Sequence, residues 1–247
     1  MIRDIPKTEL LYKKSKPIDH LSVGNGIKLM LNEQKDAAMA VKNVSHSIEL
    51  AINQIYERLM LNNKGRLIYT GAGTSGRIGV QDGVELYPTF NWPKSRLDYI
   101  IAGGNKAIIK AIENAEDDVL AAKDYISKKK INSNDVVIGL AASGNTPFTC
   151  AVLEEADKKG ALTVAISNNP AGYILQFGQA KIILDTQEEV ISGSTRLKAG
   201  TAQKICLNII SSMVMIKMGR VKNGIMSHMV PTNEKLRKRK LRLNKLL

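Results

Sequence analysis

The stretch Arg66-Leu-Ile-Tyr-Thr-Gly-Ala-Gly-Thr-Ser-Gly-Arg77 decides the fold of this chain. Its apolar run, from Leu67 to Tyr69, predicts a buried strand, and the glycines after it predict a turn into a helix. Such a turn leaves several N–H groups at the helix start without partners, and groups of this kind bind anions. The stretch therefore predicts a phosphate-binding loop made of Gly73, Thr74, Ser75 and Gly76.

The spacing of Gly71, Gly73 and Gly76 also matches the glycine fingerprint of dinucleotide-binding folds. Those folds place an acidic side chain roughly 20 residues later, at the end of the second strand, where it binds a ribose hydroxyl. Here the next apolar run, 99–102, ends in two glycines and carries no carboxylate. We therefore favour a phosphate ligand over a dinucleotide and expect no cofactor.

Two later loops share the chemistry of the first. The apolar run 135–140 and the segment 191–196 each lead through glycine and hydroxyl side chains into a predicted helix. Loops that follow the strands of an open α/β sheet gather at one edge, where ligands bind. Hydroxyls also suit helix caps, but three such loops favour a sugar-phosphate site. From these two loops we expect a site that contains Ser143, Gly144, Asn145, Thr146, Ser194, Thr195 and Lys198.

Strand and helix patterns alternate along most of the chain, which is typical of an α/β fold with a mainly parallel five-stranded sheet flanked by helices. Ahead of this part, apolar residues spaced three or four apart predict one long amphipathic helix over 33–61. We expect an amino-terminal lead-in and helix at 1–61, a sugar-phosphate domain at 62–220 and a basic helical segment at 221–247. The predicted strands lie near 67–70, 98–102, 135–140, 162–167 and 180–184, and the later helices near 76–84, 105–130, 147–159 and 197–217.

The composition limits the possible partners. Of the net charge of +13, the last 17 residues carry six, and the remainder is spread through the chain without interleaved aromatic side chains, so we expect no nucleic-acid binding. The first six residues lack the apolar core of a signal peptide, and no run approaches about 18 uncharged apolar residues, so we expect no membrane anchor. Two isolated cysteines and three scattered histidines predict a reducing cytoplasm and no metal site.

Six motifs together resemble the N-acetylmuramic acid 6-phosphate etherases, a family within the sugar isomerase (SIS) group that also contains the glucokinase regulatory protein. The similarity runs from about Thr8 to Leu236 and implies a SIS-type fold. The motifs are Thr70-Gly-Ala-Gly-Thr-Ser-Gly-Arg77, Ile101-Ala-Gly-Gly104, Ala115-Glu-Asp117, Ala141-Ala-Ser-Gly144, Gly193-Ser-Thr-Arg-Leu-Lys-Ala-Gly-Thr-Ala-Gln-Lys204 and Thr232-Asn-Glu-Lys-Leu236.

The resemblance implies a reaction and two catalytic residues. The family cleaves the D-lactyl ether of N-acetylmuramic acid 6-phosphate with water, giving N-acetylglucosamine 6-phosphate and D-lactate. Carried onto this sequence, the family's two glutamates are Glu85, as proton donor to the departing lactate, and Glu116, as base at C2 of the sugar. Such an elimination requires two carboxyl groups in opposite protonation states. Glu113 is predicted to lie on the same helical face as Glu116 and could be confused with it.

Two alternative functions remain open. A phosphosugar-binding regulator without activity is disfavoured because both glutamates are present, and a phosphosugar isomerase is disfavoured by the long motif 193–204. Asn145 stands where the family has an arginine, which removes a possible bidentate phosphate donor. We also expect a homodimer, because the helices predicted over 33–61 and 197–217 carry more apolar surface than one sheet covers.

Overall fold

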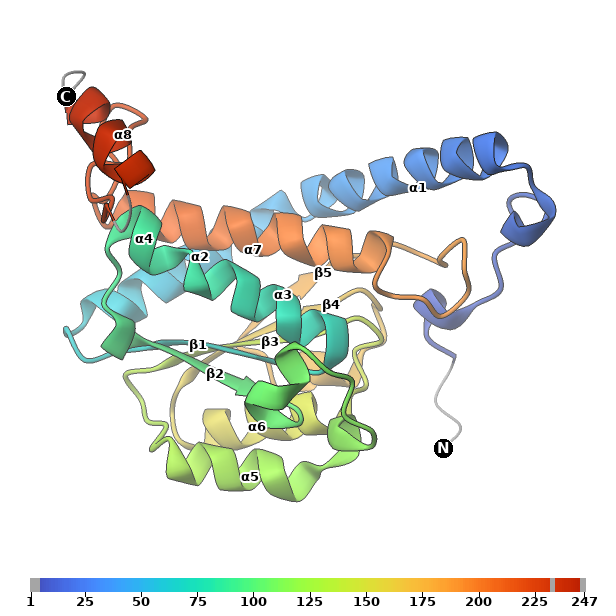
Figure 1. The fold of residues 1–247 in the computed structure, drawn as a ribbon. Helices are drawn as coiled ribbons and strands as arrows, with labels where there is room; N and C mark the ends of the chain where they lie inside the picture. Colours follow the sequence, from blue (N-terminus) through green and yellow to red (C-terminus); the bar gives the residue numbers. More distant parts are fainter. Residues whose placement is uncertain (1–4, 232–233, 245–247) are drawn as a thin grey trace.

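The computed structural model of the chain describes residues 5–231 and 234–244. Thr232 and Asn233 of the motif 232–236 lie outside the described residues, as do the first four residues of the predicted lead-in and the last three of the chain. Within the described part, the centre of the fold is one five-stranded sheet covered by helices on both faces (Figure 1).

All five strands of the sheet are parallel, in the order β2-β1-β3-β4-β5. Every position of β1, β3 and β4 is buried, which explains why these strands read as continuous apolar runs. The predicted fold class is confirmed, and each strand begins and ends within one residue of its prediction. The strands are β1 Leu67–Gly71, β2 Leu97–Ile101, β3 Val136–Ala141, β4 Leu162–Ser167 and β5 Ala180–Ile183.

The chain reverses its direction of winding at β1, because β2 pairs on one side of β1 and β3 pairs on the other. Gly71 at the end of β1 lies in register with Leu140 near the end of β3. The loops after these two strands therefore diverge to opposite faces of the sheet. A crevice at such a switch point is where ligands bind in open α/β sheets.

Two apolar layers hold the helices on the sheet. On one face, α2 (Ser45–Met60) and α7 (Lys198–Lys217) pack against the side chains of Leu67 and Tyr69, with α3 (Gly73–Val84) beside them. On the other face, α5 (Val119–Lys128) and α6 (Pro147–Lys158) pack around Ile68. Since neighbouring strand residues point to opposite faces, Leu67 and Ile68 belong to different layers.

The single helix predicted over 33–61 is two helices. Helix α1 spans Val23–Asn43 and α2 spans Ser45–Met60, and they are separated at Val44, whose φ of −115° and ψ of 22° leave the helical region. The two helices face different neighbours, because α1 packs on α7 whereas α2 also packs on β4 and β5. A straight helix cannot present its apolar stripe to both. Helix α1 also begins ten residues earlier than predicted, and its amino-terminal end projects beyond the rest of the domain (Figure 1).

The prediction of one helix over 105–130 is also wrong. Its place is taken by the 3-10 turns η4 (Gly104–Ile108) and η5 (Ala115–Asp117) and by the short helix α5. Asn114 has a left-handed φ of 57°, and the Asp118 side chain caps α5 by accepting a hydrogen bond of 2.8 Å from the N–H of Ala121. Glu113 and Glu116 therefore do not share a helical face, and Glu116 lies in an irregular turn.

Helix α7 is long and apolar enough to cross a membrane by length and composition, alone among the helices of the described residues. Of the window that meets this test, 56% is buried inside the protein. Contacts with α1, α2 and α3 explain that burial, so its apolar composition fits a core helix. The remaining elements with regular backbone are η1 Lys7–Glu9, η2 Ile18–His20, α4 Leu86–Phe90, η3 Lys94–Arg96, η6 Tyr173–Gln176 and α8 Glu234–Asn244.

Candidate functional site

The first wall of the candidate site is the start of α3, directly after β1. Gly73 has a φ of 52°, which favours glycine, and the cap residue Ala72 has no side chain that could accept a hydrogen bond from the helix start. A Cβ atom on Gly76 would lie 2.8 Å from the carbonyl oxygen of Gly71, so glycine is required where the helix crosses the strand end. The amino-terminal N–H groups of α3 therefore face the pocket without a side-chain cap.

The second wall is the start of α6, directly after β3. Pro147 occupies the first turn of α6, and Thr146 caps the helix without a side-chain hydrogen bond. The preceding loop is fixed by contacts to η6: the N–H of Tyr173 donates to Asn145 Oδ1 at 3.0 Å, and the N–H of Ile174 donates to the Gly144 carbonyl at 2.8 Å. Two helix starts thus meet at one crevice, and both favour an anion there.

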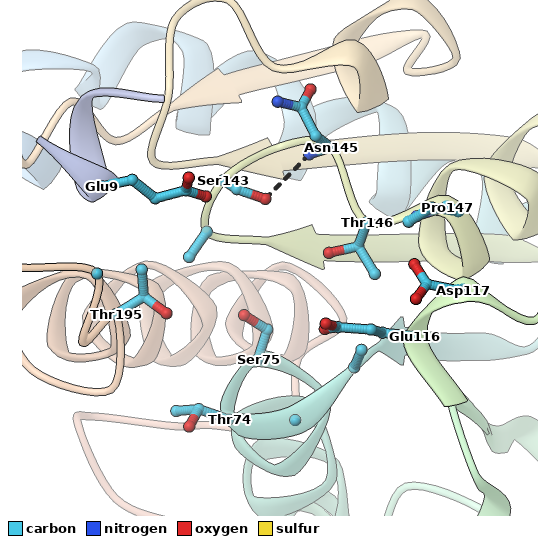
Figure 2. Close-up of a pocket in the computed structure, with 14 residues that line it drawn as sticks. Glu9, Thr74, Ser75, Glu116, Asp117, Ser143, Asn145, Thr146, Pro147 and Thr195 are labelled. Carbon is cyan, nitrogen blue, oxygen red and sulfur yellow. Dashed lines mark hydrogen bonds between the residues drawn. The ribbon is translucent and has the colours of Figure 1, made fainter. Parts of the chain in front are cut away.

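The cavity between these walls has a volume of about 380 Å³. The segment with Gly193 and Thr195 closes it on a third side, and the turn η1 reaches it with Glu9. Figure 2 shows Thr74, Ser75, Thr146 and Thr195 around the opening. The hydroxyls of these four residues form no hydrogen bond within the described residues, so all four are free to bind a ligand. The residues that line the cavity are Glu9, Ala72, Gly73, Thr74, Ser75, Glu116, Asp117, Ala142, Ser143, Asn145, Thr146, Pro147, Gly193 and Thr195.

The charges in this cavity are all negative. Glu116 and Asp117 enter from η5 on one side, and Glu9 enters from the opposite side (Figure 2). Among the described residues that line the cavity, none is a lysine or an arginine. An anion bound here would be held by N–H groups, hydroxyls and helix dipoles instead of a cationic side chain. The three carboxylates can instead accept hydrogen bonds, or a proton, from an uncharged part of the ligand.

Most of the residues predicted to bind substrate do meet in this cavity. Gly76 and Gly144 support its walls without lining it: a Cβ atom on Gly144, whose φ is 75°, would lie 2.4 Å from Gly172 Cα. Ser194 lies in the adjoining loop and does not line the cavity. The predicted residues that line it are Gly73, Thr74, Ser75, Glu116, Ser143, Asn145, Thr146 and Thr195.

Lys198 does not line the cavity, because its side chain is fully buried behind the third loop. Its Nζ lies 2.6 Å from Glu33 Oε2, and Tyr12 donates a hydrogen bond of 2.9 Å to Glu33 Oε1. Burial alone would raise the pKa of Glu33, but the hydrogen bonds from Lys198 and Tyr12 hold that pKa below its ordinary value. This ion pair joins α1 to the start of α7.

Glu189 caps the start of α7 next to this ion pair. Its carboxylate accepts hydrogen bonds from the N–H groups of Lys198, at 3.1 Å, and Ala199, at 2.9 Å. Burial raises the pKa of Glu189 despite these two bonds. The cap fixes the backbone that leads back from α7 to Thr195, so it contributes to the shape of the third wall.

Glu85 lies outside the cavity. It is exposed at the carboxyl end of α3 and lines a separate hollow of about 200 Å³ with Asp82, Lys204 and Asn208. Helix α3 has 12 residues, so its two ends are roughly 18 Å apart at about 1.5 Å per residue. Within one chain, the structure therefore does not bring Glu85 and Glu116 to the same cavity.

Sequence reasoning missed two lining carboxylates, Glu9 and Asp117. Asp117 belongs to the motif 115–117 and follows a predicted catalytic residue, so its motif was the available signal. Glu9 lies in a lead-in that has no regular pattern, and no signal in the sequence placed it near the loops. Among the described residues, no group of three or more His, Cys, Asp or Glu side chains is arranged to hold a metal ion.

Comparisons with known proteins show which families the chain is similar to. A family model described as the glucokinase regulatory protein N-terminal SIS domain matches residues 47–157. The chain is 46% identical to an N-acetylmuramic acid 6-phosphate etherase of Clostridium botulinum, over 95% of this chain and 77% of that protein. It is 42% identical to one of Deinococcus radiodurans, over 97% of this chain and 78% of that protein.

Solved structures share the fold at much lower sequence identity. A phosphoheptose isomerase of Francisella tularensis superposes with a TM-score of 0.61 at 17% identity, over 79% of this chain and all of that chain. One of Neisseria gonorrhoeae superposes with a TM-score of 0.57 at 14% identity, over 78% of this chain and 98% of that chain. These likenesses support the SIS-type architecture.

Proposed function

The chain belongs to the N-acetylmuramic acid 6-phosphate etherase family, and we propose that it cleaves the D-lactyl ether of N-acetylmuramic acid 6-phosphate with water. The products are N-acetylglucosamine 6-phosphate and D-lactate, which places the chain in amino-sugar recycling. The observation that carries the proposal is the identity of 42–46% over nearly the whole chain, combined with a cavity that has two uncapped helix starts and an unpaired glutamate.

The phosphate of the substrate binds where the starts of α3 and α6 converge. Their N–H groups, with the hydroxyls of Thr74, Ser75 and Thr146, provide donors for its oxygens, and Thr195 closes the same end. Ser143 and Asn145 complete the cradle. Because no cationic side chain among the described residues lines this cavity itself, the binding of the phosphate rests on dipoles and hydrogen bonds.

Glu116 acts as the base. After the sugar ring opens, the proton at C2 is acidic because it is next to the aldehyde. Glu116 removes that proton, the bond between C3 and the lactate oxygen breaks, and the lactate oxygen receives a proton. Water then adds at C3, and C2 regains a proton. The exposed carboxylate of Glu116, free of protein hydrogen bonds in the described residues, is available for this transfer.

The role of Glu85 as proton donor stays a prediction of the family resemblance. Since Glu85 lies outside the cavity of its own chain, this role requires a second copy, or a movement of α3, to bring it to the substrate. We propose a homodimer on separate grounds: an apolar groove of about 550 Å³ runs between α1, α2 and α7, lined by Val41, Ile48, Ile209 and Met213 among others. We further propose a cytoplasmic location, consistent with two buried cysteines that form no disulfide.

The test is to incubate purified protein with N-acetylmuramic acid 6-phosphate and to assay D-lactate, with Glu116→Gln as the control for contaminating activity. We expect lactate from the wild type and a loss of roughly 10²–10⁴-fold in the variant. Wild-type protein that binds the phosphosugar but releases no lactate would point to a regulator instead. Interconversion of sugar phosphates without lactate would point to an isomerase.

A further inference from the structure

Glu9 is a carboxylate of the cavity to which neither the family motifs nor the chemistry above gives a role. It projects into the cavity from η1, on the side of Ser143, whereas Glu116 enters from the opposite side (Figure 2). Within the described residues the Glu9 side chain forms no hydrogen bond or ion pair. A carboxylate with no protein partner at the wall of a ligand cavity is available to the ligand.

The backbone around Glu9 is fixed against the third wall of the cavity. Thr8 is fully buried, and Lys7 Nζ lies 2.8 Å from Asp185 Oδ2. Further along, the N–H of Tyr12 donates a hydrogen bond of 3.2 Å to Ser192 Oγ. These contacts join the segment 7–12 to the segment 185–195, which also carries Thr195 into the cavity. Glu9 is thus held in place by its neighbours on both sides.

The chemistry of a carboxylate limits what Glu9 can contact. It has only acceptor oxygens, so it repels a phosphate group and accepts hydrogen bonds from O–H or N–H groups. The phosphate has its own set of donors at the starts of α3 and α6. We propose that Glu9 binds the sugar portion of the phosphosugar, by accepting a hydrogen bond from a hydroxyl or from the amide N–H, and so distinguishes an amino-sugar phosphate from bare phosphate. This inference rests on the proposed function, whose substrate class it refines.

Two ligands separate this role from a general charge effect. For wild type and Glu9→Ala, the Kd of N-acetylglucosamine 6-phosphate and the Kd of inorganic phosphate are measured by calorimetry. We expect the Kd of the sugar phosphate to rise about tenfold or more, as for the loss of a hydrogen bond to a charged group. The Kd of inorganic phosphate stays the same or falls, because the variant removes a negative charge from the cavity.

Glu9→Gln keeps the size of the side chain and removes its charge, so its Kd for the sugar phosphate should lie between those of the wild type and Glu9→Ala. Glu57→Gln makes the same charge change at an exposed position on α2 and should leave both Kd values unchanged. Because Glu9 has no protein partner, the thermal unfolding midpoint of its variants should equal that of the wild type.

The inference is overturned if both ligands respond equally to Glu9→Ala, if neither responds, or if the wild type binds neither. A wild type that binds N-acetylglucosamine 6-phosphate but releases no lactate from the etherase substrate contradicts the proposed function alone. In that case the comparison of the two Kd values still decides the role of Glu9.

Discussion

Lys198 Nζ and Glu33 Oε2 lie 2.6 Å apart, and these two residues are separated by 165 positions in the sequence. The lysine is fully buried and the glutamate nearly so. Their ion pair joins α1 to the start of α7, next to the loop that brings Thr195 into the cavity. It therefore links the amino-terminal helix to one wall of the proposed phosphosugar site.

The variant Glu33→Gln should destabilise the protein by about 3–5 kcal/mol, because it removes the carboxylate that is hydrogen-bonded to the buried ammonium group of Lys198. Urea unfolding at pH 7 measures this change. The double variant Glu33→Leu with Lys198→Met should recover most of the loss, since apolar residues of similar volume replace both charges. A loss of less than about 1 kcal/mol for Glu33→Gln would mean that the pair is solvated in solution.

The same pair predicts a dependence of stability on pH. The pKa of Glu33 is held below its ordinary value of 4.5, so its contribution is fully present above pH 4.5 and is lost as the pH falls through the lowered pKa. The difference in unfolding midpoint between wild type and Glu33→Gln should therefore be constant from pH 7 to about 5 and shrink at lower pH. A difference that grew on acidification would contradict the direction of the pKa shift.

Variants of Glu116 and Glu85 should differ in their ability to exchange the hydrogen at C2 of the sugar with solvent. Exchange is followed by NMR with N-acetylglucosamine 6-phosphate in deuterated water, and lactate release is assayed separately with N-acetylmuramic acid 6-phosphate. Glu116→Gln should lose both exchange and release. Glu85→Gln should retain exchange and lose release by roughly 10²–10⁴-fold, because proton abstraction needs only the base.

Glu57→Gln is the matched control for that experiment, because Glu57 is exposed on α2 and does not line the cavity. It should retain both activities. If Glu85→Gln lost hydrogen exchange at C2 and Glu116→Gln retained it, Glu85 would be the base and Glu116 the proton donor. Full release of lactate by Glu85→Gln would remove Glu85 from the mechanism, in agreement with its position outside the cavity.

Gly144→Ala should destabilise the protein more than Gly219→Ala. Both glycines have a left-handed φ, of 75° and 73°, which costs an alanine about 1–2 kcal/mol. Only at position 144 would the added Cβ also lie 2.4 Å from Gly172 Cα and 2.5 Å from Ser167 Oγ, whereas nothing lies within 4 Å at position 219. The steric term adds about 1–3 kcal/mol. If urea unfolding gave the same loss of stability for both variants, the loop around position 144 would have moved to make room for the Cβ atom.

Sedimentation equilibrium at micromolar concentration should show a dimer. Met213 is 41% exposed and lines the groove between α1, α2 and α7, so Met213→Glu should shift the protein toward monomer. Leu120 is 79% exposed on α5, on the other face of the sheet, so Leu120→Glu should leave the dimer intact. A wild-type monomer, or equal effects of the two variants, would exclude this groove as the interface.

The sequence by itself determined the sheet and the backbone of the loops that line the cavity. The apolar runs of β1, β3 and β4 are buried at every position, so their hydrophobicity marks them without reference to the rest of the chain. Gly73 and Pro147 act through their own backbones, at a positive φ and in the first turn of a helix. Features that depend on one residue and its immediate neighbours can be predicted from sequence.

Only the tertiary structure decided where Glu9, Glu85 and Lys198 lie. Glu9 reaches the cavity because the segments 7–12 and 185–195 pair across the fold, and Lys198 turns away from it because Glu33 is its partner. Helix α3 carries Glu85 roughly 18 Å from the cradle. Each outcome depends on contacts between segments that are distant along the chain. Such contacts leave no periodicity in the sequence, because their energy depends on the packing of both partners at once.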